Sequence, residues 1–308
     1  MAPMPPVSNK REDVIAACEK EGMRHHILSD GRLMEYSVNG PKDGVPVLNF
    51  HGGGMTANWF SWKAFLPLYD QLNVRMICPS LPGSGLSDKF PGATFADYAN
   101  DSLAILEKED VNGKFYMTAW SFHTPVLLHV LAKCPERVNA VLIQSGAVPL
   151  DAPGTSKFMR SMMKMMGGCL GKYMASMMSG KSILQVAPPD LKAGAKVLLV
   201  KDPDSYHFTN NEMQWRQSLR SNTAMLDQMK ALGKLKSSDL VPMLKEVHVP
   251  ALIVIDSEEV TQANGFPWLL AALPNTKELK LDASGFNHFY PCSAEIMGEQ
   301  LDSMLKMG

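Results

Sequence analysis

The chain has 308 residues, 45% of them hydrophobic, with 30 Lys and Arg side chains against 31 Asp and Glu. This length allows a large core, and the near-neutral charge gives no electrostatic basis for binding nucleic acid or a charged membrane. No apolar run reaches the roughly 18 residues that span a bilayer, and the N-terminus lacks the apolar centre of a signal peptide.

The five cysteines are odd in number and lack C-x-x-C spacing. Disulfide frameworks belong to oxidising compartments and usually use cysteines in even number, so we expect reduced thiols and a cytoplasmic location. The sequence carries no signal of the oligomeric state.

Residues 1–20 are predicted to be an N-terminal extension, Pro-rich at first and helical from Glu12. Strand-like and helical runs then alternate as far as Gln144, which indicates a mostly parallel sheet with helices on both faces. The strand-like runs are Met23–Leu28, Leu33–Val38, Val45–Phe50, Val74–Cys78, the run that begins at Lys114, and Val138–Gln144. The helical runs are Trp59–Leu72, Thr94–Lys108 with Thr94 as N-cap, and Pro125–Cys134.

The alternation stops at about residue 149 and resumes near residue 245. Between these points the signals are mostly helical, and afterwards Ala251–Ile255 and Glu278–Leu281 read as strands, with helices at Pro267–Leu273 and Ala294–Leu305. We therefore expect an α/β core of residues 21–148 and 245–308, with residues 149–244 as a helical cap. Such a cap would lie over the carboxyl edge of the sheet, where open α/β folds bind ligands.

Ser121 lies between the strand that begins at Lys114 and the helix that begins at Pro125. A nucleophilic serine is often held on such a sharp turn, with the pattern G-x-S-x-G. Here the pattern reads Ala119-Trp120-Ser121-Phe122-His123, so both flanking glycines are replaced. His51-Gly52-Gly53-Gly54, directly after an apolar run, is a second candidate element, because glycines let backbone N–H groups approach a ligand closely.

These features together resemble the α/β-hydrolase fold superfamily over nearly the whole chain. The resemblance includes an oxyanion loop, a "D-x-P-G-x-G-x-S" loop in which Ser80 replaces the aspartate, a "P-E-R-V" strand entry, a "V-P-x-L-x-I" strand and a loop that delivers a histidine. The matching segments are His51–Gly54, Leu81–Ser87, Cys134–Ile143, Val249–Val254 and Gly285–Phe289.

The resemblance implies a Ser-acid-His order along the chain, with Ser121 as nucleophile and His288 as general base. Alignment of the "V-P-x-L-x-x-x-G-x-x-D" strand places Glu259 at the acid position, with Asp256 as the main alternative and Glu258 as another. The oxyanion donors would be the N–H of Phe122 and one from Gly53 or Gly54. A serine hydrolase of this kind needs no cofactor, and His51 has no metal-ligand spacing, so we expect no metal.

The acyl site has several candidate lining residues. Trp59, Trp120 and His123 lie near the nucleophile in the sequence, and Met162 and Met166 fall in the Met-rich cap. Flexible thioethers suit adaptable apolar cavities, although ordinary core packing accounts equally well for these side chains. His123 either faces a neighbouring helix or shapes the acyl site, and His51 is expected to pack at the base of its loop.

We expect a serine hydrolase that cleaves a carboxylic ester with an apolar or lipid-like acyl or alkyl group. The same triad would also suit an amide, a thioester, a carbon–carbon bond or acyl transfer. A non-catalytic ligand-binding or scaffold protein on the same fold is the alternative from another class, because the fold alone does not decide function.

Overall fold

The computed structural model describes residues 11–20, 22–53, 55–61, 65–155, 157, 160–161, 165, 227–256, 266–281 and 294–308. At its centre is an eight-stranded sheet with the strand order β1-β2-β4-β3-β5-β6-β7-β8. The strands are β1 (Arg24–Ile27), β2 (Leu33–Asn39), β3 (Val45–Phe50), β4 (Val74–Pro79), β5 (Phe115–Trp120), β6 (Val138–Gln144), β7 (Ala251–Asp256) and β8 (Thr276–Leu281).

The sheet is mostly parallel. β2 pairs antiparallel with β1 and with β4, and every neighbouring pair from β4 to β8 in the sheet order is parallel. A tight turn at Asp30-Gly31 joins β1 to β2, and Gly31 has a φ of +84° there. The α/β fold expected from the alternation of strands and helices is therefore confirmed.

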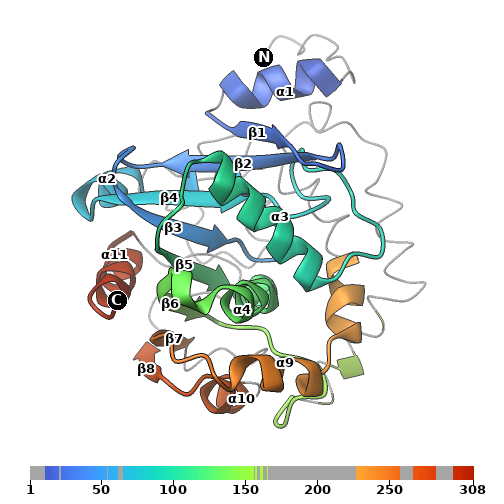
Figure 1. Ribbon diagram of the computed structural model, residues 1–308, viewed down its shortest axis with the longest axis vertical. Coiled ribbons are helices and arrows are strands. Elements are labelled where there is room, and N and C mark those ends of the chain that lie inside the picture. The colour runs from blue at the N-terminus through green and yellow to red at the C-terminus, as the bar shows by residue number, and fades with distance from the viewer. Residues whose placement is uncertain are drawn as a thin grey trace, which may run out of the picture.

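Helices cover both faces of this sheet (Figure 1). On one face, apolar side chains of four helices join one core cluster. These helices are α3 (Phe95–Lys108), α4 (Thr124–Lys133), α9 (Ser237–Leu244) and α10 (Phe266–Ala272). On the other face, α2 (Leu66–Gln71) and α11 (Ala294–Leu305) pack on a second cluster. The short helix α1 (Arg11–Lys20) lies next to β1. Its first residue is one position before Glu12, where the sequence predicted a helix to begin.

The start of α3 agrees with the predicted N-cap at Thr94. By contrast, the single helix predicted over Trp59–Leu72 is wrong. Thr94 caps α3 in a capping box with Asp97: its hydroxyl accepts from the Asp97 N–H at 3.3 Å, and the Asp97 carboxylate accepts from the Thr94 N–H at 2.8 Å. In place of one helix, the structure has a 3-10 segment η1 (Ala57–Ser61) and the separate helix α2. Pro67 explains the break, because proline fits the first turn of a helix and disrupts its interior.

A buried carboxylate joins the antiparallel side of the sheet to the end of α3. The Glu109 carboxylate accepts from the Tyr36 hydroxyl at 2.6 Å and from Arg24 at 2.8 and 3.0 Å, and it also pairs with Arg75. Burial acts to raise the pKa of Glu109, but the hydrogen bonds from Tyr36 and Arg24 outweigh it and hold that pKa below its usual value. This cluster connects β1, β2 and β4 through one side chain.

Most of the predicted cap, residues 149–244, lies outside the described residues, so its extent stays a prediction. Of the part that is described, residues 227–234 and α9 are helical. No described helix combines the length and apolar character that a membrane span requires.

Candidate active site

Ser121 lies where β5 turns into the helical segment η2 (Ser121–His123) and then α4. Its φ of +54° is in the left-handed region, which residues other than glycine rarely adopt. The Ser121 carbonyl accepts from the Ala147 N–H and the Thr124 hydroxyl, each at 2.9 Å, and these bonds hold the turn in place. The predicted strand-to-helix turn is therefore confirmed, with a strained serine at its tip.

The neighbours of Ser121 belong to the interior. Ala119 is fully buried in β5 between β3 and β6, where it pairs with Phe50 and Ile143. Trp120 is 2% exposed and packs in the second core cluster, next to Gly52. For Trp120 the packing interpretation therefore accounts for its position.

The glycine loop after β3 lies directly against the turn that holds Ser121. β3 and β5 are parallel, with Phe50 opposite Ala119, so both strands end at the same edge of the sheet. A Cβ atom added to Gly53 would lie 3.1 Å from the Cβ of Phe122. Gly53 therefore packs closely against the side chain of Phe122, the residue that holds the other predicted oxyanion donor, and a methyl group at position 53 would be a tight fit.

His123 contacts this glycine loop. Its Nδ1 forms a hydrogen bond with the main-chain oxygen of His51, and the two rings meet edge to face with their centroids 4.7 Å apart. Both imidazoles are fully buried. Burial lowers the pKa of His123 to about 4 and, together with the neighbouring His123, lowers that of His51 well below its usual value. Both histidines are neutral at pH 7 as a result.

His51 packs at the base of the glycine loop, as its sequence position suggested. Its Nδ1 bonds the carbonyl of Gly52 at 2.9 Å, and its Nε2 accepts from the Leu81 N–H at 3.1 Å. Because a carbonyl only accepts and a backbone N–H only donates, the proton of His51 is on Nδ1. One imidazole thereby joins the loop after β3 to the loop after β4.

The loop after β4 is braced by a carboxylate from another strand. The Ser80 hydroxyl donates to Oε1 of Glu35 at 2.7 Å and accepts from the Ala57 N–H at 2.9 Å. Glu35, in β2, is fully buried, and a Cβ on Gly85 would lie 2.1 Å from its Oε1. Ser80, which stands where the loop pattern of the resemblance has an aspartate, thus pairs with the carboxylate of Glu35, a residue that the sequence pattern did not single out.

The remaining predicted site residues lie partly or wholly outside the described residues. Asp256 is the last residue of β7, which pairs with β6 so that Val254 lies opposite Gln144; its side chain is not described. β7 therefore ends at the same edge of the sheet as β5, where the predicted acid would be needed. Trp59 lies in η1, with its side chain not described, and those wholly outside are Gly54, Met162, Met166, Glu258, Glu259 and His288.

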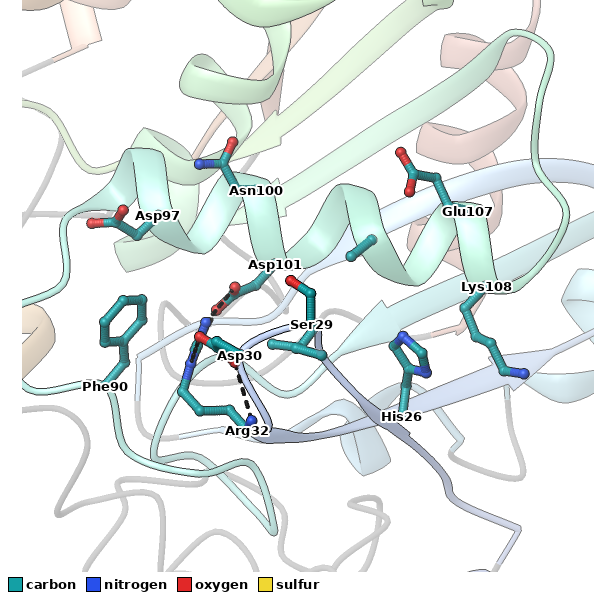
Figure 2. Close-up of a pocket in the computed structure, with 12 residues that line it drawn as sticks. His26, Ser29, Asp30, Arg32, Phe90, Asp97, Asn100, Asp101, Glu107 and Lys108 are labelled. Carbon is teal, nitrogen blue, oxygen red and sulfur yellow. Dashed lines mark hydrogen bonds and ion pairs between the residues drawn. The ribbon is translucent and has the colours of Figure 1, made fainter.

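A surface groove of about 520 Å³ runs between the β1–β2 hairpin and α3 (Figure 2). Three of the charged side chains in this groove pair with each other: Arg32 donates to Asp101 at 2.7 Å and to Asp30 at 2.6 Å. The Arg32 guanidinium also lies 3.9 Å from the centre of the Phe90 ring. Ser121 is not among the described residues that line this groove. In the part of the chain that the structure describes, no group of three or more His, Cys, Asp or Glu side chains has the arrangement of a metal site.

Comparison with known proteins agrees with this architecture. The sequence profile of the family described as alpha/beta hydrolase fold matches residues 45–176. The esterase RhEst1 from a Rhodococcus species superposes with a TM-score of 0.67 at 16% identity, over 93% of this chain and 100% of that one. The chain has the α/β-hydrolase fold.

Two curated relatives match less than half of this chain. A non-heme chloroperoxidase from Streptomyces lividans is 28% identical over 123 residues, which are 40% of this chain and 44% of that protein. A haloalkane dehalogenase from Psychrobacter cryohalolentis is 28% identical over 122 residues, 38% of each chain. The chain thus spans less than half the length of these relatives.

Proposed function

We propose that this protein is a serine hydrolase that cleaves a carboxylic ester through an acyl-enzyme. The observation that carries the proposal is the backbone of Ser121: a non-glycine residue with φ +54° at a strand-to-helix turn, on the edge of the sheet where β3, β5 and β7 end. Such strain costs on the order of 1–3 kcal/mol and usually persists where function requires it.

In the proposed mechanism the Ser121 oxygen attacks the ester carbonyl carbon while His288 takes the hydroxyl proton. The tetrahedral intermediate collapses to an acyl-Ser121 ester, and His288 returns the proton to the departing alcohol. Water then attacks the acyl-enzyme in the same way and releases the acid. Glu259, with Asp256 as the alternative, would orient His288 and stabilise its charged form.

The oxyanion would be met by the N–H of Phe122 and one from Gly53 or Gly54. The contact between Gly53 and Phe122 supports this assignment, because both donors must face one oxygen atom. A single such donor is typically worth about 3–4 kcal/mol in the transition state. Neither donor is a titratable group, so this part of the site would work unchanged across the pH range in which His288 is neutral.

The substrate is proposed to be an apolar or lipid-like ester. The Met-rich segment that includes Met162 and Met166 supports it, because thioether side chains adapt to irregular apolar groups. Serine at position 121 disfavours epoxide or alkyl halide chemistry of the kind that starts from an aspartate nucleophile. Amide, thioester or carbon–carbon cleavage and acyl transfer would use the same acyl-enzyme, and a substrate panel would distinguish them.

The first test is the intact mass of the protein after treatment with a fluorophosphonate probe. We expect one adduct on the wild type and none on Ser121→Ala, with both proteins equally folded by circular dichroism. A folded wild type without an adduct would contradict the proposal. Stabilisation of that unreactive protein by small apolar ligands, in a concentration-dependent way, would then favour the ligand-binding alternative.

A further inference from the structure

Four buried polar side chains and the backbone of Leu81 form a ring of contacts next to the glycine loop. His51 and His123 are fully buried, and Gln228 and Ser84 are each 1% exposed. They come from four places in the chain: the loop after β3, the end of η2, the helical residues 227–234 and the loop after β4. Buried polar groups are costly unless they are hydrogen-bonded, so the pairing within this ring can be worked out group by group.

The position of the proton on His123 follows from its partner. Nδ1 of His123 faces the His51 carbonyl oxygen, which can only accept, so Nδ1 carries the proton. Since burial keeps this imidazole neutral at pH 7, Nε2 has no proton and needs a donor. The donor must come from the side chain that lies next to Nε2.

Gln228 is the residue in that place. Its side chain lies within interaction range of the His123 ring. In one orientation of the amide, Nε2 of Gln228 lies 3.4 Å from the Ser84 hydroxyl. In that orientation neither Oε1 of Gln228 nor Nε2 of His123 has a hydrogen-bond partner among the described residues. The two ends of a glutamine amide are interchangeable in shape. With the amide reversed, its N–H donates to His123 Nε2 and its oxygen accepts from the Ser84 hydroxyl, so that every group is paired.

We propose that His123 is a positioning residue for the oxyanion loop, held in one tautomer by Gln228. In this arrangement Ser84 donates to Gln228, Gln228 to His123, and His123 to the carbonyl of His51, the residue two before Gly53. Leu81 N–H closes the ring through His51 Nε2. The imidazole of His123 therefore holds the glycine loop against Phe122. The G-x-S-x-G pattern has a glycine at position 123, which could not make this contact. The inference deepens the proposed function and rests on it for its catalytic consequence.

A matched pair of substitutions tests the role of the Nδ1 donor. His123→Phe keeps a ring of similar size and removes the donor, whereas His123→Asn places an amide N–H near the position of Nδ1. We expect His123→Phe to lower kcat and the rate of fluorophosphonate labelling about 10- to 100-fold with little change in KM, because a displaced donor acts mainly in the transition state. His123→Asn should recover labelling to within about threefold of wild type. If His123→Phe is labelled at the wild-type rate, or if both folded variants lose labelling equally, the inference is overturned.

Nitrogen NMR of ¹⁵N-histidine-labelled protein tests the tautomer without any activity. The chain has eight histidines, so the His123 resonances are assigned by their loss in His123→Asn. At pH 7 we expect protonated Nδ1 and unprotonated Nε2 in the wild type, and protonation of both nitrogens in Gln228→Glu, whose carboxylate cannot donate. A proton on Nε2 of the wild type, or an unchanged spectrum in Gln228→Glu, would refute the proposed pairing.

The two experiments separate failure of this inference from failure of the proposed function. If wild-type Ser121 is not labelled, the proposed function fails, and the NMR experiment alone decides the hydrogen-bond ring. If wild type is labelled and His123→Phe is labelled equally fast, the proposed function stands and the positioning role of His123 is wrong.

Discussion

Replacement of Gly53 by alanine would test the contact between the two proposed oxyanion donors. The added Cβ would lie 3.1 Å from the Phe122 Cβ and 3.2 Å from its Cγ. Carbon atoms prefer separations of about 3.5–4.0 Å, so the glycine loop and the turn at Phe122 must separate by about 0.5 Å. The φ of Gly53 lies outside the left-handed region, so the new side chain adds no dihedral strain and this displacement is its main effect.

The size of the effect follows from the sensitivity of oxyanion stabilisation to geometry. Complete loss of one donor lowers kcat about 100- to 1,000-fold, and a misplacement of about 1 Å can cost about 100-fold. A separation of about 0.5 Å should therefore lower kcat about tenfold, which is about 1.4 kcal/mol of transition-state stabilisation. KM should change little, because the ground-state carbonyl depends less on these donors.

The assay is the second-order rate of fluorophosphonate labelling at Ser121, supported by steady-state kinetics on a short-chain ester. Gly113→Ala is the matched control, because Gly113 is exposed and a Cβ there meets nothing within 4 Å. The control should label at the wild-type rate. If Gly53→Ala has the labelling rate, the kcat and the melting temperature of the wild type, the assignment of Gly53 to the oxyanion site is refuted.

Three further predictions concern residues whose environment the structure defines. Ser121→Gly should be more stable to urea than Ser121→Ala by about 1 kcal/mol, because only glycine adopts φ +54° without strain, although neither variant is labelled; equal stability would contradict the strained turn. Glu109→Gln should lower the free energy of unfolding by about 3 kcal/mol at pH 7, since it breaks a buried charged pair. Because the pKa of Glu109 is depressed in the folded state, its contribution is complete above the unfolded value of about 4.3 and is lost as the pH falls through the folded value. The difference between wild type and Glu109→Gln, followed by urea unfolding at several pH values, should therefore shrink in acid; a constant difference would argue against the ion pair. Cys78 is fully buried and its thiol pKa is raised by burial, so its reaction with a thiol reagent should proceed only at the rate of unfolding; fast labelling of the native protein, judged against Cys78→Ser, would contradict this placement.

The sequence was most informative where local patterns decide the structure. Val45–Phe50 and Val138–Gln144 were readable as buried strands because their apolar runs have the length and composition of strands covered on both faces. The Thr94 cap was readable because a threonine directly before a helical run is a local signal, which the capping box with Asp97 confirms. The turn at Ser121 was readable in outline because a strand-like run and a helical run meet there.

The contacts that build the site were not readable, because they depend on strand register. His123 meets the carbonyl of His51, 72 residues earlier, only because Phe50 pairs with Ala119. A shift of this register by one residue would turn each side chain to the other face of the sheet. The pairing of Ser80 with Glu35 likewise depends on the antiparallel register of β2 and β4. Pro67, in the first turn of α2, is the local signal in the sequence that contradicts a single helix over Trp59–Leu72.

The pairing of Ser80 with Glu35 bears on attempts to stabilise the protein by consensus design. Such a design would place at position 80 the aspartate of the family's loop pattern. Ser80→Asp would then set a second carboxylate beside the fully buried Glu35, whose Oε1 is only 2.7 Å from the present hydroxyl. Two buried acids at that distance cannot both ionise. The two positions form one buried hydrogen-bonded unit, so an aspartate at position 80 is compatible with the core only if residue 35 changes with it.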